Sequence, residues 1–206
     1  MHVVLLGKPM AGKGTQAKML EERLALPHIS TGDLVRNEIK KGTPFGKRAL
    51  AYLAKGELVP DADIISLLQK RLPKKGFILD GFPRTIVQAE ALQGITSVDI
   101  VVDVTCPDAV IIKRTLARES CIKCGAPYGL DKKPRKKGVC DLCHGALRRR
   151  SDDTKELVTK RLAVYEKQTK PLIAYYKKNK LYIAVDGTKA IEKIPEEILA
   201  HIEKIK

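Results

Sequence analysis

Four short runs of apolar residues occur along the chain, and segments with helical periodicity separate them. Uninterrupted apolar runs of this length predict strands that are buried on both faces, as in a parallel sheet. Strands that alternate with helices predict an α/β, doubly wound fold. The predicted strands are residues 3–6, 77–80, 99–104 and 181–185.

Helix start and stop signals predict the helices between these strands. Ser30 and Thr31 are N-cap candidates, and Pro44 and Pro60 each begin a helical pattern. The predicted helices are residues 12–24, 31–39, 44–54, 61–72 and 153–178, and a further helix ends near residue 118.

Residues 121–150 interrupt this alternation, because they hold four Gly, two Pro and four Cys with little helical periodicity. We interpret them as an inserted subdomain. Two Cys-x-x-Cys pairs can place four thiolates tetrahedrally around Zn²⁺, whereas a pair of disulfides is the alternative. A reducing compartment favours the metal, and four protein ligands predict a structural zinc site. The predicted ligands are Cys121, Cys124, Cys140 and Cys143.

The chain has 206 residues, of which 44% are hydrophobic, and a formal net charge of +15. This charge predicts an anionic partner such as nucleic acid, a membrane surface or a phosphorylated small molecule. No apolar run approaches the ~20 residues of a membrane span, and the N-terminus lacks the features of a signal peptide. We therefore expect a cytosolic, soluble protein without a membrane partner.

A glycine-rich segment lies directly between the first predicted strand and the first helix. Its sequence matches G-x-x-x-x-G-K, with the hydroxyl residue one place late. Backbone N–H groups of such a loop surround a phosphate chain, and the lysine adds a mobile positive charge. The sequence therefore predicts a nucleotide phosphate site at Gly7, Gly12, Lys13, Gly14 and Thr15.

The second motif, Asp80-Gly81-Phe82-Pro83-Arg84, follows an apolar strand. Ligands of parallel sheets bind at the carboxyl ends of the strands. We therefore expect Asp80 to hold water around a phosphate-bound Mg²⁺, and Arg84 to contact phosphate.

With these motifs, the chain resembles the adenylate kinases with a zinc-bearing lid over nearly its whole length. The resemblance rests on the phosphate loop, on Ser30-Thr31-Gly32-Asp33 and on Arg150-Ser151-Asp152-Asp153. It implies a P-loop parallel sheet and the reaction MgATP + AMP ⇌ 2 ADP, with a role in adenine nucleotide homeostasis. It also implies a core of residues 1–29, 60–118 and 154–206, an AMP-binding segment at 30–59 and a zinc lid at 119–153.

The resemblance assigns roles to single residues. Lys13, Arg84, Arg118, Arg150 and Arg161 would be catalytic. ATP would be bound by the phosphate loop together with Arg114, Arg118 and Lys189. AMP would be bound by Thr31, Arg36, Leu58, Val59, Gly81, Arg84, Gln88, Arg150 and Arg161.

Phosphoryl transfer of this kind needs alignment and neutralised charge, not a strong base, which agrees with many arginines and no histidine in the motifs. The sequence departs from the family pattern at two positions. Met10 occupies a place where the family usually has glycine, so either its φ is negative or turnover suffers. Glu119 stands where many members have another arginine.

Two other readings remain at this point. Thr31, Val59 and Gln88 favour AMP, but a kinase for another nucleoside monophosphate shares the same motifs. A zinc ribbon with flanking Lys and Arg also suggests nucleic-acid binding, although only 4% aromatic residues and no Trp supply few stacking surfaces. We expect a monomer that acts on ATP, AMP and ADP and does not bind nucleic acid.

Overall fold

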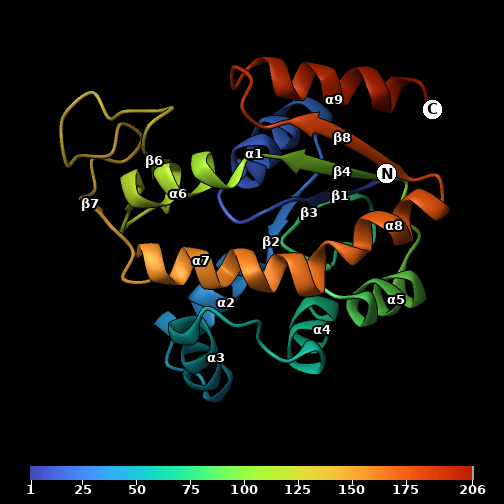
Figure 1. Cartoon of the computed structure of the whole chain (residues 1–206), viewed down its shortest axis with the longest axis horizontal. Coiled ribbons are helices and arrows are strands. Elements are labelled where there is room, and N and C mark those ends of the chain that lie inside the picture. Colours follow the sequence, from blue (N-terminus) through green and yellow to red (C-terminus); the bar gives the residue numbers. More distant parts are fainter. Residues whose placement is uncertain (206) are drawn as a thin grey trace.

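Five parallel strands form the central sheet of the computed structural model, which describes residues 1–205 (Figure 1). Their order across the sheet is β2-β3-β1-β4-β8. All neighbouring pairs run parallel, so the carboxyl ends of the strands share one edge of the sheet. The strands are β1 (His2–Leu6), β2 (His28–Ser30), β3 (Phe77–Asp80), β4 (Ile100–Thr105) and β8 (Tyr182–Asp186).

The four predicted strands are confirmed, with ends shifted by about one residue, and the α/β class is confirmed with them. The fifth strand, β2, was not predicted. It has three residues, with polar side chains at both ends, and pairs with β3 at the edge of the sheet. A strand this short carries no hydrophobic pattern, so only its pairing partner identifies it.

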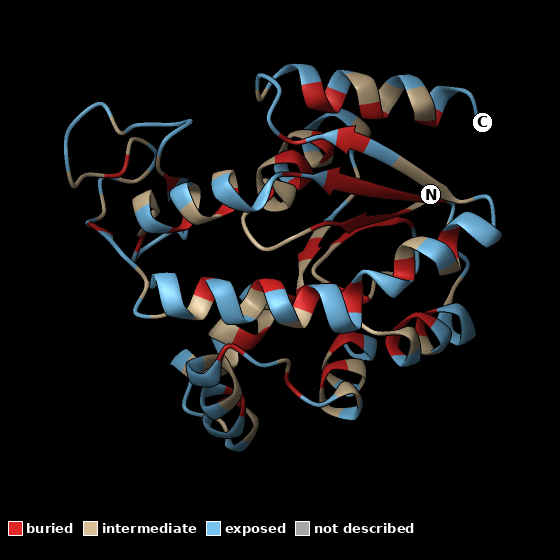
Figure 2. Ribbon diagram, in the orientation of Figure 1, coloured by how far each residue is buried: buried red, intermediate tan, exposed pale blue. Residues whose placement is uncertain are grey.

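Helices cover both faces of the sheet, and successive residues of β1 point into two different cores, shown red in Figure 2. Val3 belongs to the cluster that includes residues of α1, α6, α7 and α9, whereas Val4 belongs to the cluster that includes residues of α2, α3, α4, α5 and α8.

Among residues 1–205, no helix has the length and apolarity that crossing a membrane requires. The helices are α1 (Lys13–Leu24), α2 (Thr31–Lys40), α3 (Pro44–Lys55), α4 (Asp61–Gln69), α5 (Ile86–Ile95), α6 (Asp108–Ala117), α7 (Lys155–Val164), α8 (Pro171–Lys178) and α9 (Lys193–Glu203).

The single helix predicted for residues 153–178 consists of three parts. Thr154 caps α7, its hydroxyl accepting a hydrogen bond from Leu157 N–H at 3.2 Å, so the helix begins two residues late. A π-helical turn, η1 (Tyr165–Thr169), then separates α7 from α8. In this turn Lys170 N–H donates to Tyr165 O, one residue further back than in an α-helix.

The insertion (residues 119–153) stands apart from the main sheet, at the left of Figure 1. It forms a small antiparallel sheet in the order β6-β5-β7, with β5 (Glu119–Cys121), β6 (Pro127–Tyr128) and β7 (Leu147–Arg148). Its buried apolar cluster is small, and two of its members are predicted zinc ligands: Cys121, Ala126, Tyr128, Cys140 and Leu147.

Candidate active site and metal centre

The phosphate loop joins β1 to α1 at the carboxyl edge of the sheet. At Gly7, whose φ is 135°, a Cβ atom would lie 2.4 Å from Val104 O, so no larger residue fits. Gly12 precedes α1 with φ 106° and supplies no side-chain cap. Within residues 1–205, the N–H groups of Gly12, Lys13 and Gly14 form no hydrogen bond with protein atoms. Free N–H groups at the start of a helix are the donors that bind phosphate.

Met10 corrects one expectation about this loop. Its φ is 64°, so the expected negative φ is wrong. A left-handed conformation costs a side-chain-bearing residue about 1 kcal/mol. The Met10 side chain packs against the core cluster that includes Leu20, which offsets part of this cost.

Lys13 lies at the centre of the loop, and its Nζ donates hydrogen bonds of 2.8 Å to Gly7 O and to Lys8 O. Burial lowers the pKa of Lys13 to about 8, and the charge of Arg84 adds to this shift, while Asp80 opposes it. The protein around Lys13 therefore neutralises the positive charge of its ammonium group only in part. An anion beside Nζ would stabilise its charged form.

The second motif begins where β3 ends, beside the phosphate loop. The side chain of Asp80 is largely buried, and its Oδ2 lies only 3.3 Å from the position that a Cβ on Gly14 would take. Gly81 has φ 79°, and a Cβ there would lie 2.8 Å from Thr31 Oγ1. Arg84 then turns back, and its Nε donates to Gly81 O at 2.8 Å.

The six arginines predicted for the site come from α2, the β3–α5 loop, the end of α6, the insertion and α7. Two of them, Arg84 and Arg150, have no carboxylate within 4 Å among the described residues. Burial lowers the pKa of both, and that of Arg150 falls to about 10 because Arg36 and Arg118 are also near. The other four are paired as Arg36–Asp33, Arg114–Asp131, Arg118–Asp153 and Arg161–Asp152.

Two of the predicted AMP-binding residues, Thr31 and Gln88, contact the second motif. Thr31 is buried and donates from Oγ1 to Asp80 O at 3.2 Å. Gln88 is also buried, and its Oε1 accepts from Arg84 N–H at 2.8 Å. Its Nε2 donates to Asp61 Oδ1 at 2.7 Å. The sequence places Asp61 at a helix start, just after Leu58 and Val59 of the family resemblance, but it does not predict this contact with Gln88.

Two further predicted AMP-binding residues, Leu58 and Val59, precede α4, and Val59 is buried. The segment after β8 approaches the phosphate loop, because a Cβ on Gly187 would lie 2.6 Å from Ala11 O. Lys189 follows two residues later. Its ammonium binds Glu197 of α9 at 2.7 Å, so the side chain is paired away from the loop.

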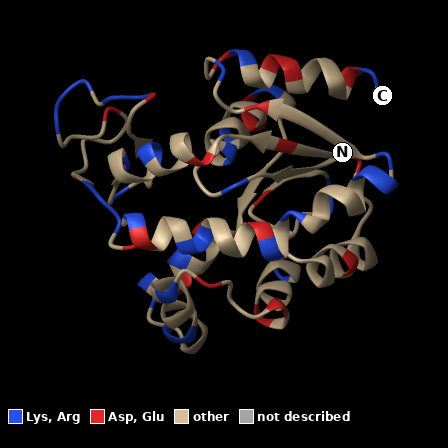
Figure 3. Cartoon of the chain, in the orientation of Figure 1, with Lys and Arg blue, Asp and Glu red and all other residues tan. Residues whose placement is uncertain are grey.

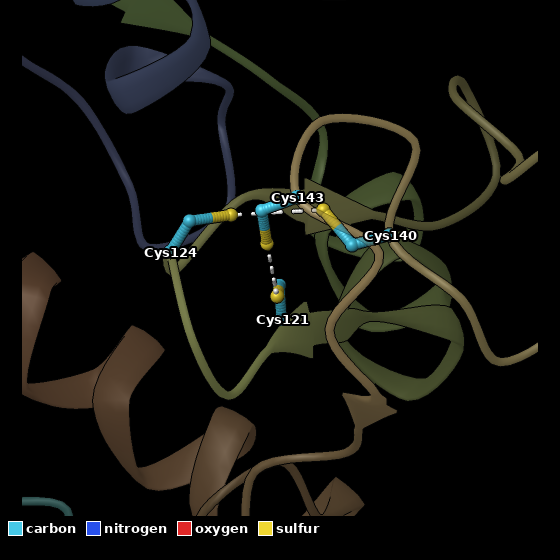
Figure 4. Close-up of side chains that lie close together, drawn as sticks. All are labelled: Cys121, Cys124, Cys140 and Cys143. Carbon is cyan, nitrogen blue, oxygen red and sulfur yellow. Dashed lines mark hydrogen bonds between the residues drawn. The ribbon is translucent and has the colours of Figure 1, made fainter.

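The four predicted zinc ligands form one cluster in the insertion (Figure 4). Their Sγ atoms all lie within 4.8 Å of one another, with Cys121 and Cys143 at 3.4 Å and Cys124 and Cys140 at 3.6 Å. A tetrahedron with Zn–S bonds of about 2.3 Å has sulfur atoms about 3.8 Å apart. The spacing and the four soft donors therefore fit a closed zinc site.

Two neighbouring residues support this cluster. A Cβ on Gly145 would lie 2.9 Å from Cys121 Sγ, so glycine is needed there. The buried Tyr128 donates from its hydroxyl to Cys140 Sγ at 3.5 Å and accepts from Asp141 N–H at 2.8 Å. The Tyr128 hydrogen bond lowers the pKa of Cys140 to about 6, which favours the thiolate that binds metal. The sequence contains no motif that indicates this role of Tyr128.

The insertion also carries nine Lys or Arg and only two Asp between residues 121 and 150 (Figure 3). Most of these cations are exposed, including the five in residues 132–137. Within the described chain, those five form no ion pair. Water screens these exposed charges more strongly than the half-buried charges of Lys13 and Arg84.

Comparisons with known proteins identify the family of the chain. The family model described as "Adenylate kinase" matches residues 5–181. The adenylate kinase of Archaeoglobus fulgidus is 47% identical over 216 residues, covering 100% of both chains. Those of Clostridium tetani (48% over 210 residues, 96% of both chains) and Methanosarcina acetivorans (46% over 214 residues, 99% of both chains) are similarly related. The chain therefore belongs to the adenylate kinase family of enzymes.

Proposed function

We propose that the chain transfers the terminal phosphoryl group of MgATP reversibly to AMP, giving two ADP, and so contributes to adenine nucleotide homeostasis. The observation that carries this proposal is the set of half-buried cations Lys13, Arg84 and Arg150. None has a carboxylate within 4 Å among the described residues, and burial lowers the pKa of each. Bound phosphates supply the negative charge that these groups lack.

On the donor side, the free N–H groups of Gly12, Lys13 and Gly14 hold the β- and γ-phosphates of ATP together with Lys13 Nζ. To reach them, Nζ exchanges its two hydrogen bonds with loop carbonyls for bonds with phosphate oxygens. Gly7 and Thr15 shape the two ends of this loop. Arg114, Arg118 and the Lys189 segment complete the ATP site.

On the acceptor side, Arg36 and Arg84 hold the phosphate of AMP, and Thr31, Leu58, Val59, Gly81 and Gln88 surround its nucleoside. Gln88 already uses its amide on Asp61 and Arg84. The amide nitrogen of Gln88 has two N–H donors, so one can contact adenine while the other stays on Asp61 and Oε1 stays bonded to Arg84. Asp61 thus holds Gln88 in position.

The reaction itself needs little from a base. The attacking oxygen of AMP is anionic at neutral pH, so the protein aligns the two phosphates and neutralises the charge of the transferring group. Arg118, Arg150 and Arg161 serve this neutralisation. Closing the insertion over the site excludes water, which would otherwise accept the phosphoryl group.

Two metals fit the residues present. Asp80, largely buried beside Lys13 and Gly14, would hold water molecules of the Mg²⁺ that accompanies ATP, and this ion neutralises phosphate charge. Cys121, Cys124, Cys140 and Cys143 would hold Zn²⁺, which orders the insertion without an open coordination position.

The three segments expected from the sequence have separate roles in this proposal. Residues 1–29, 60–118 and 154–206 form the core that carries the phosphate loop. Residues 30–59 bind AMP, and residues 119–153 form the lid over ATP. We also propose a cytoplasmic monomer, because every residue assigned to the reaction comes from one chain.

A coupled assay of ADP formation from ATP tests the proposal, with AMP, CMP, UMP and GMP compared as acceptors. We expect AMP to be used in strong preference. Equal use of the four acceptors contradicts the specificity for AMP and favours a broader nucleoside monophosphate kinase. No transfer to any acceptor, together with tight binding of RNA, favours the nucleic-acid reading instead.

A further inference from the structure

The two aspartates between residues 121 and 150 are used in different ways. Asp141 Oδ1 accepts a hydrogen bond of 2.9 Å from Arg135 N–H, and so stabilises the insertion itself. Asp131 instead reaches out of the insertion, and its Oδ2 lies 2.8 Å from Nε of Arg114 in α6. No other carboxylate among the described residues lies within 4 Å of Arg114.

A tight turn gives Asp131 this position. Gly129 N–H donates to Lys132 O at 2.8 Å, which closes the turn around Asp131. The turn packs on the end of α6, where a Cβ on Gly129 would lie 3.5 Å from Ala117 O. Arg114 lies one turn earlier on the same helix. Asp131 therefore approaches an arginine of the core although Lys132 and Lys133 follow it directly in the chain.

The pair differs from the Arg118–Asp153 pair in the exposure of its carboxylate. Asp153, the partner of Arg118, is fully buried, and its two oxygens accept from Nε and Nη2 of the arginine at 2.7 Å and 2.5 Å. Asp131 is 47% exposed, whereas Arg114 is only 12% exposed. A half-exposed carboxylate leaves an ion pair at low cost, because water solvates it again.

We propose that Asp131 is an internal competitor of ATP, an affinity-determining residue whose carboxylate occupies Arg114 until a nucleotide phosphate displaces it. The inference rests on the role of Arg114 in ATP binding given above. Binding ATP then includes the cost of breaking the Asp131–Arg114 pair. Removing the carboxylate therefore strengthens ATP binding, whereas a residue that only closes the insertion weakens it when removed.

The test is Asp131→Asn, with KM for ATP measured at saturating AMP. Because exposed ion pairs contribute up to about 1 kcal/mol, we expect KM to fall about threefold, and at most about fivefold. We expect kcat to be unchanged or reduced, because the freed arginine also holds the ADP product. KM for AMP stays the same. An unchanged or higher KM for ATP overturns the proposal.

Two variants serve as controls. Asp141→Asn makes the same charge change in the same subdomain and keeps an oxygen that can accept from Arg135 N–H, so its KM for ATP stays near that of the unmodified chain. Asp131→Glu keeps the carboxylate and behaves likewise. An equal fall in KM for Asp141→Asn overturns the proposal, because net charge then explains the effect. At high salt the advantage of Asp131→Asn disappears, since exposed pairs are screened.

Equilibrium binding of ATP without AMP separates this inference from the proposed function. A chain that binds ATP but forms no ADP contradicts the proposed reaction and still tests Asp131. In that case a lower Kd for Asp131→Asn supports the competitor role, and an unchanged or higher Kd overturns it.

Discussion

The phosphate-loop region and the insertion both carry excess positive charge, but they hold it in opposite ways. Around Lys13 the cations are few and half-buried, and burial lowers the pKa values of Lys13 and Arg84. In the insertion the cations are many and exposed, and most form no ion pair among the described residues. The net charge of +15 is therefore a poor guide to the site, because water screens most cations of the insertion, whereas Lys13 and Arg84 lie in surroundings that lower their pKa values.

The two regions also differ in what holds them together. Two large apolar clusters on opposite faces of the sheet fix the phosphate loop, so its geometry depends on packing. The cluster of the insertion has five residues, and two of them are candidate zinc ligands. A subdomain with so small a core depends on its metal.

Replacing the half-buried cation should have the largest effect. We expect Lys13→Met to lower kcat/KM by about 10³-fold, because one charged donor to the transferring phosphates is lost. Folding stability without nucleotide should be unchanged or higher, since a desolvated charge is removed. The matched change of an exposed cation, Lys136→Met, should alter kcat/KM less than twofold, as about ±0.5 kcal/mol is usual for surface sites. Similar losses of kcat/KM in both variants would contradict the difference between the half-buried and the exposed cations.

Loss of zinc should have the second largest effect on kcat/KM. We expect Cys140→Ala, or chelation of zinc, to make residues 119–153 sensitive to proteolysis and to reduce kcat/KM about 10²-fold, because Arg150 is misplaced. Circular dichroism of the core should change little. Cys106→Ala removes a buried cysteine outside the cluster and should keep the insertion resistant. Unaltered proteolysis after zinc removal argues that packing, not metal, orders the insertion.

A smaller effect is expected from the hydroxyl beside the cluster. Tyr128→Phe removes the hydrogen bond to Cys140 Sγ and the acceptor for Asp141 N–H. We expect zinc affinity, measured by competition with a chelating dye, to fall about tenfold. Tyr175→Phe, which loses a hydroxyl bonded to Gln93 outside the insertion, should leave zinc affinity unchanged. If the two variants bind zinc with equal affinity, the Tyr128 hydroxyl does not contribute to the metal site.

The smallest expected effect is the uptake of a proton by Lys13 when a nucleotide binds. The pKa of Lys13 is lowered from 10.5 to about 8, and phosphate raises it again. Nucleotide binding at about pH 9 should therefore take up as much as one proton, which calorimetry in buffers of different ionisation enthalpy measures. Without nucleotide, the folded chain binds fewer protons than the unfolded chain between these two pKa values, so this group makes stability rise with pH there. Lys13→Met should show neither effect.

Local patterns predicted the parts of the site that depend on local chemistry. The phosphate loop follows from glycines at positions that only glycine fits, such as Gly7, and the zinc cluster follows from two Cys-x-x-Cys pairs. The positions of the site arginines remained expectations from the resemblance, since only the fold brings α2, α6 and α7 together.

What the sequence could not predict depends on contacts between distant segments. Strand β2 is defined by its pairing with β3 and not by a pattern of its own. The bonds of Gln88 with Asp61 and of Tyr128 with Cys140 join residues 27 and 12 positions apart. The positive φ of Met10 is set by the fixed path of the loop, which overrides the preference of the side chain.

The π-helical turn between α7 and α8 changes the direction in which the side chains of the following helix point. In an uninterrupted α-helix with about 3.6 residues per turn, Val158 and Tyr176 would face the same direction. The turn takes up one extra residue and rotates α8 by about 100° relative to α7. Val158 accordingly packs in one core cluster and Tyr176 in the other. Deleting a single residue from this stretch would therefore turn the buried face of α8 away from the sheet.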